Sequence, residues 1–312
     1  MKVLITGSTG LVGTSLASAL ARDGHTVCRL IRPQSAVTGA SPFAEIHGKT
    51  ERFDVAWNPA AGELGGAGVG ADAVVNLAGA SIAGGRWTKA RKELLRTSRI
   101  DTTRALINAL AKMNARPRVL VSASAIGIYG HRGGEVLTEE SKPGTDFLAG
   151  LAREWETEAL KAEALGIRVV LARFGIILSR HGGALAKMLL PFKLGLGGRL
   201  GSGKQWMSWI ALEDVVGVVR FAIENGAVRG AMNVVAPQPV QNAEFTKMLA
   251  KALRRPAFFP VPAFALRLTL GEMADALLLS SQRVTPQVLE KLGYRFLHAD
   301  LSAALNAVLQ RR

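Results

Sequence analysis

Three glycines near the N-terminus, Gly7, Gly10 and Gly13, are spaced three residues apart. They follow a short apolar run at 2–6 and precede a segment, starting at Leu11, whose apolar residues recur with helical spacing. Glycines between a strand and a helix let the backbone turn tightly and approach a pyrophosphate, to which the helix N-terminus offers N–H donors. The stretch therefore predicts a dinucleotide-binding loop. The alternative is a glycine-rich turn that binds nothing.

The next apolar segment, residues 26–32, bears on which dinucleotide is bound. In NAD-specific enzymes the second strand ends in an acidic residue that bonds the adenosine ribose hydroxyls. Here the segment ends in Arg-Leu-Ile-Arg with no Asp or Glu. Arg32, at the strand end, is expected to meet a 2′-phosphate, and Arg29, further inside, is the weaker candidate. The sequence thus favours NADP(H) over NAD(H), unless Arg32 is an ordinary surface residue.

Strand-like and helix-like segments alternate along the first 180 residues. Strands are expected near 2–7, 26–32, 53–59, 71–79, 118–124 and 167–178, and helices at 11–24, 88–113 and 151–166. Such alternation implies right-handed βαβ units. The predicted fold class is α/β, a Rossmann-like, doubly wound parallel sheet with helices on both faces.

After about residue 180 the alternation breaks. Residues 181–198 are glycine-rich and are expected to be irregular, a segment placed to fold over the cleft as a lid. Further on we expect a helix at 212–226 capped by Glu213 or Asp214, a strand at 231–236, a helix capped by Asn242 and a helical tail with proline breaks. The predicted domains are an NADP-binding domain over 1–180, to which about 205–240 return, and a smaller, mainly helical substrate-side subdomain over 181–312.

The composition is that of an ordinary globular chain, with 312 residues, 48% hydrophobic and 20% charged. One cysteine, Cys28, excludes an intramolecular disulfide and any multi-cysteine metal site. No segment reaches the ~20 apolar residues that cross a bilayer, so a cytoplasmic protein with no membrane partner is expected. The net charge of +15 would suit nucleic acid, but the basic residues are scattered, which argues against that partner.

Several longer stretches resemble one known family. TGSTGLVG, VVNLAGA, SASAIGIYG and LEDV are similar to motifs of extended, or atypical, short-chain dehydrogenases/reductases. More narrowly, FLAGLAREWE, LLPFKLGLGGRLGSGKQWMSWI and LLLSSQRVTPQVLEKLGYRF resemble the nucleoside-diphosphate-sugar-epimerase-like group, also labelled cell-division-inhibitor-like, with its small C-terminal domain. The resemblance covers essentially the whole chain. It implies a nicotinamide cofactor but no particular substrate.

The resemblance also assigns cofactor contacts to residues of this chain. The pyrophosphate would be lined by the glycine loop, at Gly7, Thr9, Gly10, Leu11, Val12 and Gly13. Arg32 would take the 2′-phosphate, and Ala78 and Gly79 would pass under the adenine-side ribose and diphosphate. Ser122 would approach the nicotinamide ribose, and Arg173 would border the nicotinamide or the substrate.

The expected catalytic residues depart from the family pattern. Family members carry a Ser together with a Tyr and a Lys spaced as YxxxK, and the Tyr exchanges a proton with the substrate oxygen. Here Leu148 and Ala152 match the Tyr and Lys positions, and Arg99 stands where an Asn often completes the set. Ser124 stands at the place of the active-site serine. Tyr129 is the candidate acid, unless it only shapes the pocket.

Three further side chains could serve the site or could be ordinary surface residues. Arg99 is expected to bind an anionic group of substrate or cofactor, or else to lie on a helix surface. Glu156 and His181 are read as solvated residues in preference to an acid or a base.

The predicted function is an NADP(H)-dependent oxidoreductase or a sugar-nucleotide epimerase-like enzyme. Its substrate is an unidentified small molecule, such as a nucleotide sugar or a carbonyl compound. The alternative is a non-catalytic NADP(H)-binding sensor or interaction module, which the missing YxxxK favours. Helices near 88–113 and 147–165 resemble the pair through which extended relatives dimerise, so a homodimer is a further hypothesis.

Overall fold

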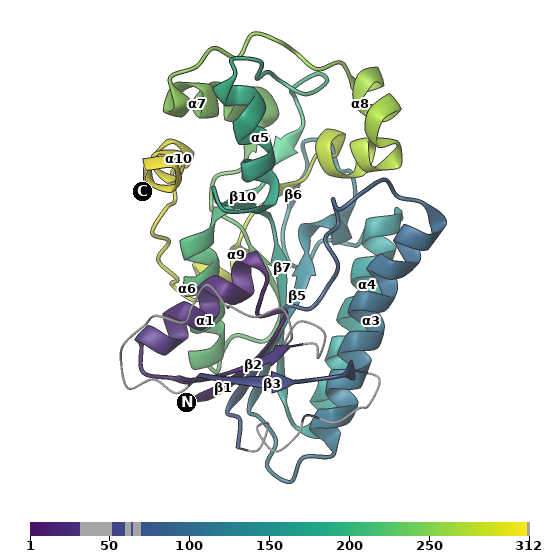
Figure 1. Ribbon diagram of the computed structural model, residues 1–312, viewed down its shortest axis with the longest axis vertical. Coiled ribbons are helices and arrows are strands. Elements are labelled where there is room, and N and C mark those ends of the chain that lie inside the picture. Colours follow the sequence, from purple (N-terminus) through teal and green to yellow (C-terminus); the bar gives the residue numbers. More distant parts are fainter. Residues whose placement is uncertain (32–51, 60–63, 65–69, 311–312) are drawn as a thin grey trace.

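The computed structural model describes residues 1–31, 52–59, 64 and 70–310. A seven-stranded parallel sheet with the order β3-β2-β1-β4-β5-β7-β11 lies at its centre (Figure 1). The strands are β1 (Lys2–Thr6), β2 (Thr26–Ile31), β3 (Arg52–Ala56), β4 (Ala73–Asn76), β5 (Val119–Ala125), β7 (Arg168–Phe174) and β11 (Gly230–Val234). The predicted parallel sheet is confirmed.

Helices cover both faces of this sheet. Successive strand residues point to opposite faces, so Val3 and Ile5 pack on one side and Leu4 on the other. The first side is covered by α1 (Leu11–Arg22), α6 (Leu212–Glu224) and α9 (Gln287–Lys291), and the second by α3 (Lys89–Ala111) and α4 (Phe147–Leu160). Figure 1 shows α1 and α6 to one side of the strands and α3 and α4 to the other. This is the predicted doubly wound arrangement.

The helices that cover the sheet begin and end close to where the sequence predicts. Gly24 adopts φ 82° just after α1, and Gly166 adopts φ 78° where the short 3₁₀ helix η4 (Lys161–Leu165) ends. Both are left-handed conformations that glycine adopts at little cost. The Thr88 hydroxyl accepts a hydrogen bond from Arg91 N at 3.2 Å and caps α3.

Two segments after residue 170 differ from the prediction. The single strand expected at 167–178 is broken at Gly175 into β7 and β8 (Ile176–Leu178), and β8 pairs with β10 (Trp209–Ala211) in a separate small sheet. A Cβ on Gly175 would lie 2.6 Å from the carbonyl oxygen of Ser208, so the backbones cross too closely there for a side chain. The segment expected to be irregular after residue 181 contains helix α5 (Gly183–Lys193).

Two side chains that were predicted to cap helices form hydrogen bonds with segments distant in sequence. The N-cap of α6 is Ala211, and the Asp214 carboxylate accepts from the amides of Leu297 and His298 at 2.7 and 3.0 Å. Helix α7 (Asn242–Leu253) has Gln241 as N-cap, while Asn242 Oδ1 accepts from Leu200 N at 2.8 Å. Both side chains therefore link segments that lie far apart in sequence.

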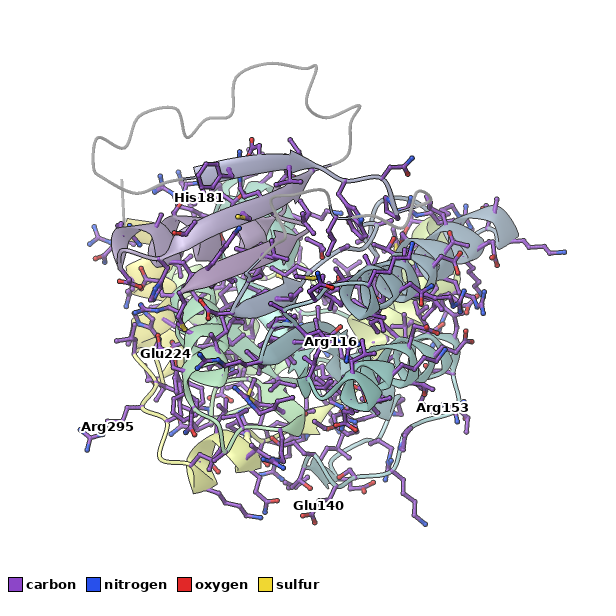
Figure 2. The ribbon with its side chains drawn as sticks, turned by 90° about the horizontal axis from the view of Figure 1, so that it is seen from below. Arg116, Glu140, Arg153, His181, Glu224 and Arg295 are labelled. Carbon is purple, nitrogen blue, oxygen red and sulfur yellow. The ribbon has the colours of Figure 1, made fainter. Side chains whose placement is uncertain are left out.

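A second region stands at the carboxyl end of the sheet. It contains α5, α7, α8 (Ala263–Leu270), the π-helix η5 (Ala274–Leu279) and α10 (Leu301–Gln310), and it has its own core around Trp209 and Phe245. Within the described part of the chain, no helix is both long and apolar enough to cross a membrane. Figure 2 shows the labelled side chains of Arg153 and Arg295 at opposite edges of the molecule, in line with scattered charge.

Candidate functional site

The glycine loop between β1 and α1 forms a cradle that side chains would fill. Gly7 adopts φ 64°, and a Cβ there would lie 2.4 Å from the Leu77 carbonyl oxygen. A Cβ on Gly13 would lie 2.4 Å from the carbonyl oxygen of Gly7. Gly10 is the N-cap of α1 and provides no side-chain cap, while the buried Ser8 Oγ has no hydrogen-bond partner among the residues that the structure describes. The loop therefore fits a phosphate group, which would accept from backbone amides and from Ser8.

The cradle faces the point where the strand order reverses. From β1 the chain builds outward through β2 and β3, and then crosses back to β4 on the other side of β1. Such a reversal opens a crevice at the carboxyl ends of the strands, where α/β proteins bind ligands. Ala78 and Gly79 lie two and three residues after β4. Ala78 is partly exposed, and Gly79 and Thr9 of the loop are exposed. Arg32, the predicted 2′-phosphate ligand, lies outside the described residues.

Other predicted contacts of the loop are apolar. The side chain of Val12 packs against the core of the first sheet face. The side chain of Leu11 lies beside the backbone of Gly182 and Gly183, at the start of α5. The segment expected to act as a lid forms α5, which begins against the N-terminus of α1, and Lys187 of α5 donates to the Ala83 carbonyl at 2.8 Å. These contacts join α5 to segments that follow β1 and β4.

A buried polar cluster underlies the floor of the crevice. Asn76 accepts from the Thr6 hydroxyl at 2.7 Å and donates to Thr103 Oγ1 at 2.9 Å and to Ser122 Oγ at 3.3 Å. The Trp155 indole also donates to Thr103 Oγ1, at 3.0 Å. The Ser122 side chain has no exposed surface, so it does not reach the nicotinamide ribose as expected from the sequence. It helps to hold β4 and β5 together.

The Arg99 guanidinium lies beside the exposed Gly79. A Cβ on Gly79 would be 3.1 Å from Arg99 Cζ, and Arg99 donates to the carbonyls of Leu95 and Ala80, both at 3.0 Å. Its guanidinium also lies over the Trp155 ring, 5.2 Å from the centroid. Burial, and then the nearby Arg91 charge, lower the pKa of Arg99 to about 10, so the group stays cationic at neutral pH. Arg99 is thus a half-buried cation at the crevice, rather than a helix-surface residue.

We expect the change Arg99→Gln to weaken NADPH binding by about tenfold, because a charge-assisted hydrogen bond contributes roughly 1.5–3 kcal/mol. Arg99→Lys, which keeps the charge, should recover part of the affinity. Fluorescence titration measures both. The control is Arg96→Gln, one turn earlier on α3, whose partner Glu154 is half exposed. Equal NADPH affinity in Arg99→Gln and wild type would contradict the assignment.

Ser124, at the end of β5, belongs to a buried ionic network. Its hydroxyl donates to Glu156 Oε1 at 2.6 Å. The guanidinium of Arg173 binds both carboxylate oxygens of Glu156, each at 2.8 Å. All three side chains are largely buried, but Ser124 keeps 3% of its surface exposed, whereas Tyr129 and Ser122 keep none. Although burial alone would lower it, hydrogen bonds with Glu156 and Tyr129 raise the pKa of Arg173 above its usual value. Arg173 is therefore occupied by Glu156 beneath the crevice.

Tyr129 lies on the far side of this network. Its hydroxyl donates to Asn233 Oδ1 at 2.7 Å and accepts from Arg173 Nη1 at 2.9 Å, and its side chain is fully buried. Burial raises the pKa of Tyr129. A phenol without exposed surface does not meet a substrate, so the geometry places Tyr129 in a structural role instead of the predicted acid role.

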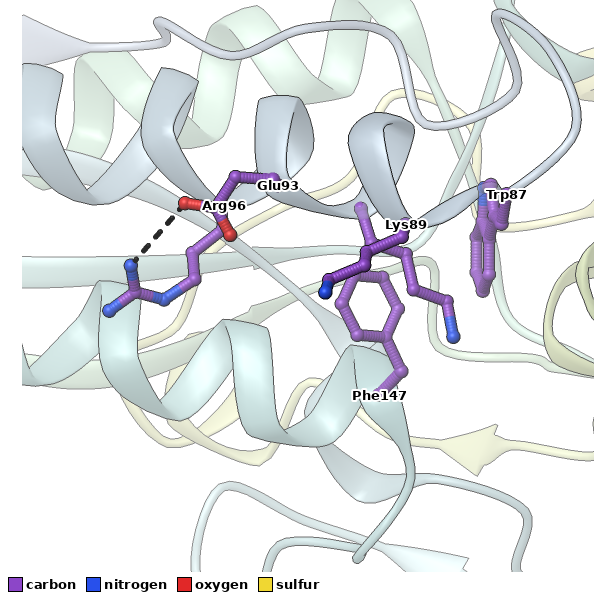
Figure 3. Close-up of a pocket in the computed structure, with 6 residues that line it drawn as sticks. Trp87, Lys89, Glu93, Arg96 and Phe147 are labelled. Carbon is purple, nitrogen blue, oxygen red and sulfur yellow. Dashed lines mark ion pairs between the residues drawn. The ribbon is translucent and has the colours of Figure 1, made fainter.

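A separate hollow lies on the outer side of α3 and α4. It has a volume of about 390 Å³ and is lined by Trp87, Lys89, Lys92, Glu93, Arg96 and Phe147. Figure 3 shows the Phe147 ring between lysine side chains, with the Glu93–Arg96 ion pair further along α3. The Lys92 ammonium lies 4.8 Å from the centre of that ring. Four of the six lining side chains are charged, and a homodimer through α3 and α4 stays a prediction.

Comparison with known proteins identifies the family. A profile of the NAD dependent epimerase/dehydratase family matches residues 3–235, and that of a domain of unknown function (DUF1731) matches 261–308. The epimerase family protein Mb2239 of Mycobacterium bovis is 43% identical over 310 residues, 99% of this chain and 98% of that protein. The chain belongs to the NAD-dependent epimerase/dehydratase family. YfhF of Bacillus subtilis, also an epimerase family protein, is 39% identical across 100% of this chain and 99% of its own length.

Solved structures of epimerases have the same fold as this epimerase-family chain. The human epimerase family protein SDR39U1, crystallised with NADPH, superimposes with a TM-score of 0.84 at 32% identity, covering 99% of both chains. UDP-glucuronic acid 4-epimerase from Bacillus cereus, solved with UDP-glucuronic acid and NAD, gives a TM-score of 0.74 at 17% identity, covering 98% of this chain and 97% of the other. The second likeness is one of fold alone. The resemblance to extended short-chain dehydrogenases/reductases drawn from the motifs is confirmed.

The sequence-based interpretation of Glu156 is also wrong. Glu156 was expected to be solvated, but it is the buried centre of the Ser124–Arg173 network. A signal was present, because Glu156 lies in helical register with Ala149, Ala152 and Ala159, which form the buried face of α4. A carboxylate on a buried stripe requires a partner, since an unpaired buried charge is very costly.

Proposed function

We propose that this protein is an NADP(H)-dependent oxidoreductase, epimerase-like in type, that acts on a small molecule. The observation that carries the proposal is the glycine cradle at Gly7 and Gly13, open to the crevice where the strand order reverses. The human relative solved with NADPH supports the choice of nucleotide. Residues 26–32, which end with Arg32, contain no Asp or Glu, and this also favours a 2′-phosphate over a free ribose hydroxyl.

Some residues of the crevice would bind the cofactor, and others would transfer a proton. The glycine loop and Ser8 would hold the pyrophosphate, Ala78 and Gly79 would pass under the cofactor, and Arg99 would hold an anionic group. The nicotinamide would accept or give a hydride when bound. Neither Leu148 nor Ala152 moves a proton, so the site lacks a YxxxK pair and needs another route.

Ser124 and Glu156 are the pair we assign to that route. The only hydroxyl proton of Ser124 is donated to Glu156 Oε1, so its oxygen meets any second partner as an acceptor. A substrate hydroxyl would donate its proton to Ser124 while Ser124 passes its own to Glu156, as the hydride leaves the same carbon. The reverse sequence would protonate a carbonyl oxygen during reduction. An epimerase would use both directions in one cycle.

A panel of carbonyl compounds and nucleotide sugars tests the enzyme, with NADPH consumption or sugar epimerisation as readout. For any active compound, Ser124→Ala should lower turnover by about 100-fold or more while NADPH binding stays unchanged. The control Ser141→Ala, in an outer turn where the hydroxyl accepts from Thr138 N, should leave turnover as it is. Normal turnover in Ser124→Ala would contradict the proton route.

A second candidate function is a non-catalytic NADP(H)-binding sensor. It is favoured by the deep burial of Tyr129 and by the absence of a Tyr–Lys pair at Leu148 and Ala152. NADPH binding without turnover of any compound in the panel is the outcome expected of a sensor.

A further inference from the structure

Exposed apolar side chains gather at the end of the second region. Of the twelve large hydrophobic residues exposed among the described residues, seven lie in two short segments, 190–196 and 258–268. The first segment provides Leu190, Leu194 and Leu196. Leu190 and Leu194 are four residues apart, and therefore lie on one face at the end of α5.

The second segment provides Phe258 and Phe259 in the connection from α7 to α8, and Phe264 and Leu268 on α8. Phe264 and Leu268 are again spaced by one helical turn. Phe258 is 82% exposed and Leu268 76%, so these side chains project outward instead of lining a hollow. Figure 1 shows the connection from α7 to α8 crossing the top of the molecule, above α5.

Backbone contacts hold the two segments side by side. Phe259 N donates to the Gly197 carbonyl at 3.3 Å, and Val261 N donates to the Arg199 carbonyl at 2.9 Å. Gly195 lies 3.7 Å from Pro256, measured from its ideal Cβ position. The two segments therefore lie side by side, and their seven exposed side chains are called here the apolar patch.

Basic residues predominate in the two stretches of chain that carry the apolar patch. Residues 181–212 contain four Lys and Arg, residues 245–271 contain five, and neither stretch contains an Asp or a Glu. Arg267 pairs with Asp275 from η5. Arg254 and Arg255 immediately precede the Phe258–Phe259 pair in an Arg-Arg-Pro-Ala-Phe-Phe-Pro sequence. Exposed aromatic and leucine side chains beside arginines suit the boundary between lipid headgroups and acyl chains.

We propose that the apolar patch binds the surface of an anionic lipid bilayer, with the phenylalanines and leucines inserted among the acyl chains and the basic residues against the headgroup phosphates. The protein would lie on the bilayer surface without crossing it. This proposal differs from the expectation that the protein has no membrane partner. A second copy of the chain fits less well, because a symmetric pair would bring the two basic rims together. A projecting patch of this kind is also unlike a groove for a peptide.

Co-sedimentation with vesicles tests the proposal on the full chain. Wild type should bind vesicles of mixed phosphatidylglycerol and phosphatidylcholine, bind pure phosphatidylcholine at least tenfold more weakly, and be released by high salt. The double change Phe258→Ser and Phe259→Ser should weaken binding at least tenfold, as should Arg254→Gln with Arg255→Gln. The control Leu297→Ser alters a side chain 72% exposed outside the apolar patch and should change nothing.

NADPH affinity serves as the check on folding for every variant and should not change, since the apolar patch holds no residue of the glycine loop. Wild type left in the supernatant with anionic vesicles overturns the proposal, as does equal loss of binding in Leu297→Ser. A dimer abolished by the phenylalanine variant, without vesicle binding, would show that a second copy occupies the patch. Failure of NADPH binding in wild type would bear on the proposed function and not on this surface.

Discussion

Replacing Gly7 with valine is expected to reduce NADPH affinity by roughly thirtyfold or more. The new Cβ would lie 2.4 Å from the Leu77 carbonyl oxygen at a φ of 64°, so the loop and the end of β4 must move apart. A β-branched residue held in the left-handed region costs roughly 1–3 kcal/mol, and relief of that strain would displace the amides aimed at the pyrophosphate. Fluorescence titration with NADPH measures the affinity, and thermal unfolding measures the loss of stability.

Gly24→Val is the matched control for this change. Gly24 has a φ of 82°, follows α1 at its far end and has no atom within 4 Å of an added Cβ. It should lose stability from backbone strain alone and keep wild-type NADPH affinity. If Gly7→Val binds NADPH as tightly as Gly24→Val, the glycine loop is only a turn.

Replacing Arg173 with methionine is expected to destabilise the fold by about 3–5 kcal/mol, because it leaves the Glu156 carboxylate buried without its cation. Urea unfolding measures the loss.

The double variant Arg173→Met with Glu156→Gln should recover much of the lost stability, since it removes the buried charge together with its partner. Arg96→Met is the control, because its partner Glu154 is half exposed and such pairs contribute about 1 kcal/mol or less. An Arg173→Met protein as stable as Arg96→Met would mean that Glu156 has another partner.

The sheet and its main helices could be predicted because local signals agree with the tertiary structure. Val3, Leu4 and Ile5 are apolar on both faces of β1, as a central parallel strand requires, and Gly24 and Gly166 mark helix ends. The break at Gly175 could not be predicted, because it depends on a close approach of Ser208, 33 residues along the chain. The same limit applies to Asp214 and Asn242, whose partners lie far away in sequence.

The candidate site was predicted in part, for a similar reason. The glycine loop depends on residues adjacent in sequence, so its geometry follows from the motif. Ser122 and Ser124 lie on one face of β5 toward α3 and α4, but whether each reaches the crevice depends on Asn76 and Glu156. Tyr129 lies after β5 and bonds Asn233 of β11 and Arg173 of β7, and no local pattern encodes these contacts.

The central claim is that the crevice beside the glycine loop binds NADPH. Its most direct test is a fluorescence titration of the purified protein with NADPH and with NADH, in wild type and in Arg32→Ala. We expect NADPH to bind at least tenfold more tightly than NADH, and Arg32→Ala to remove that preference. Binding of neither nucleotide would contradict the claim, and the proposed enzyme would fall with it.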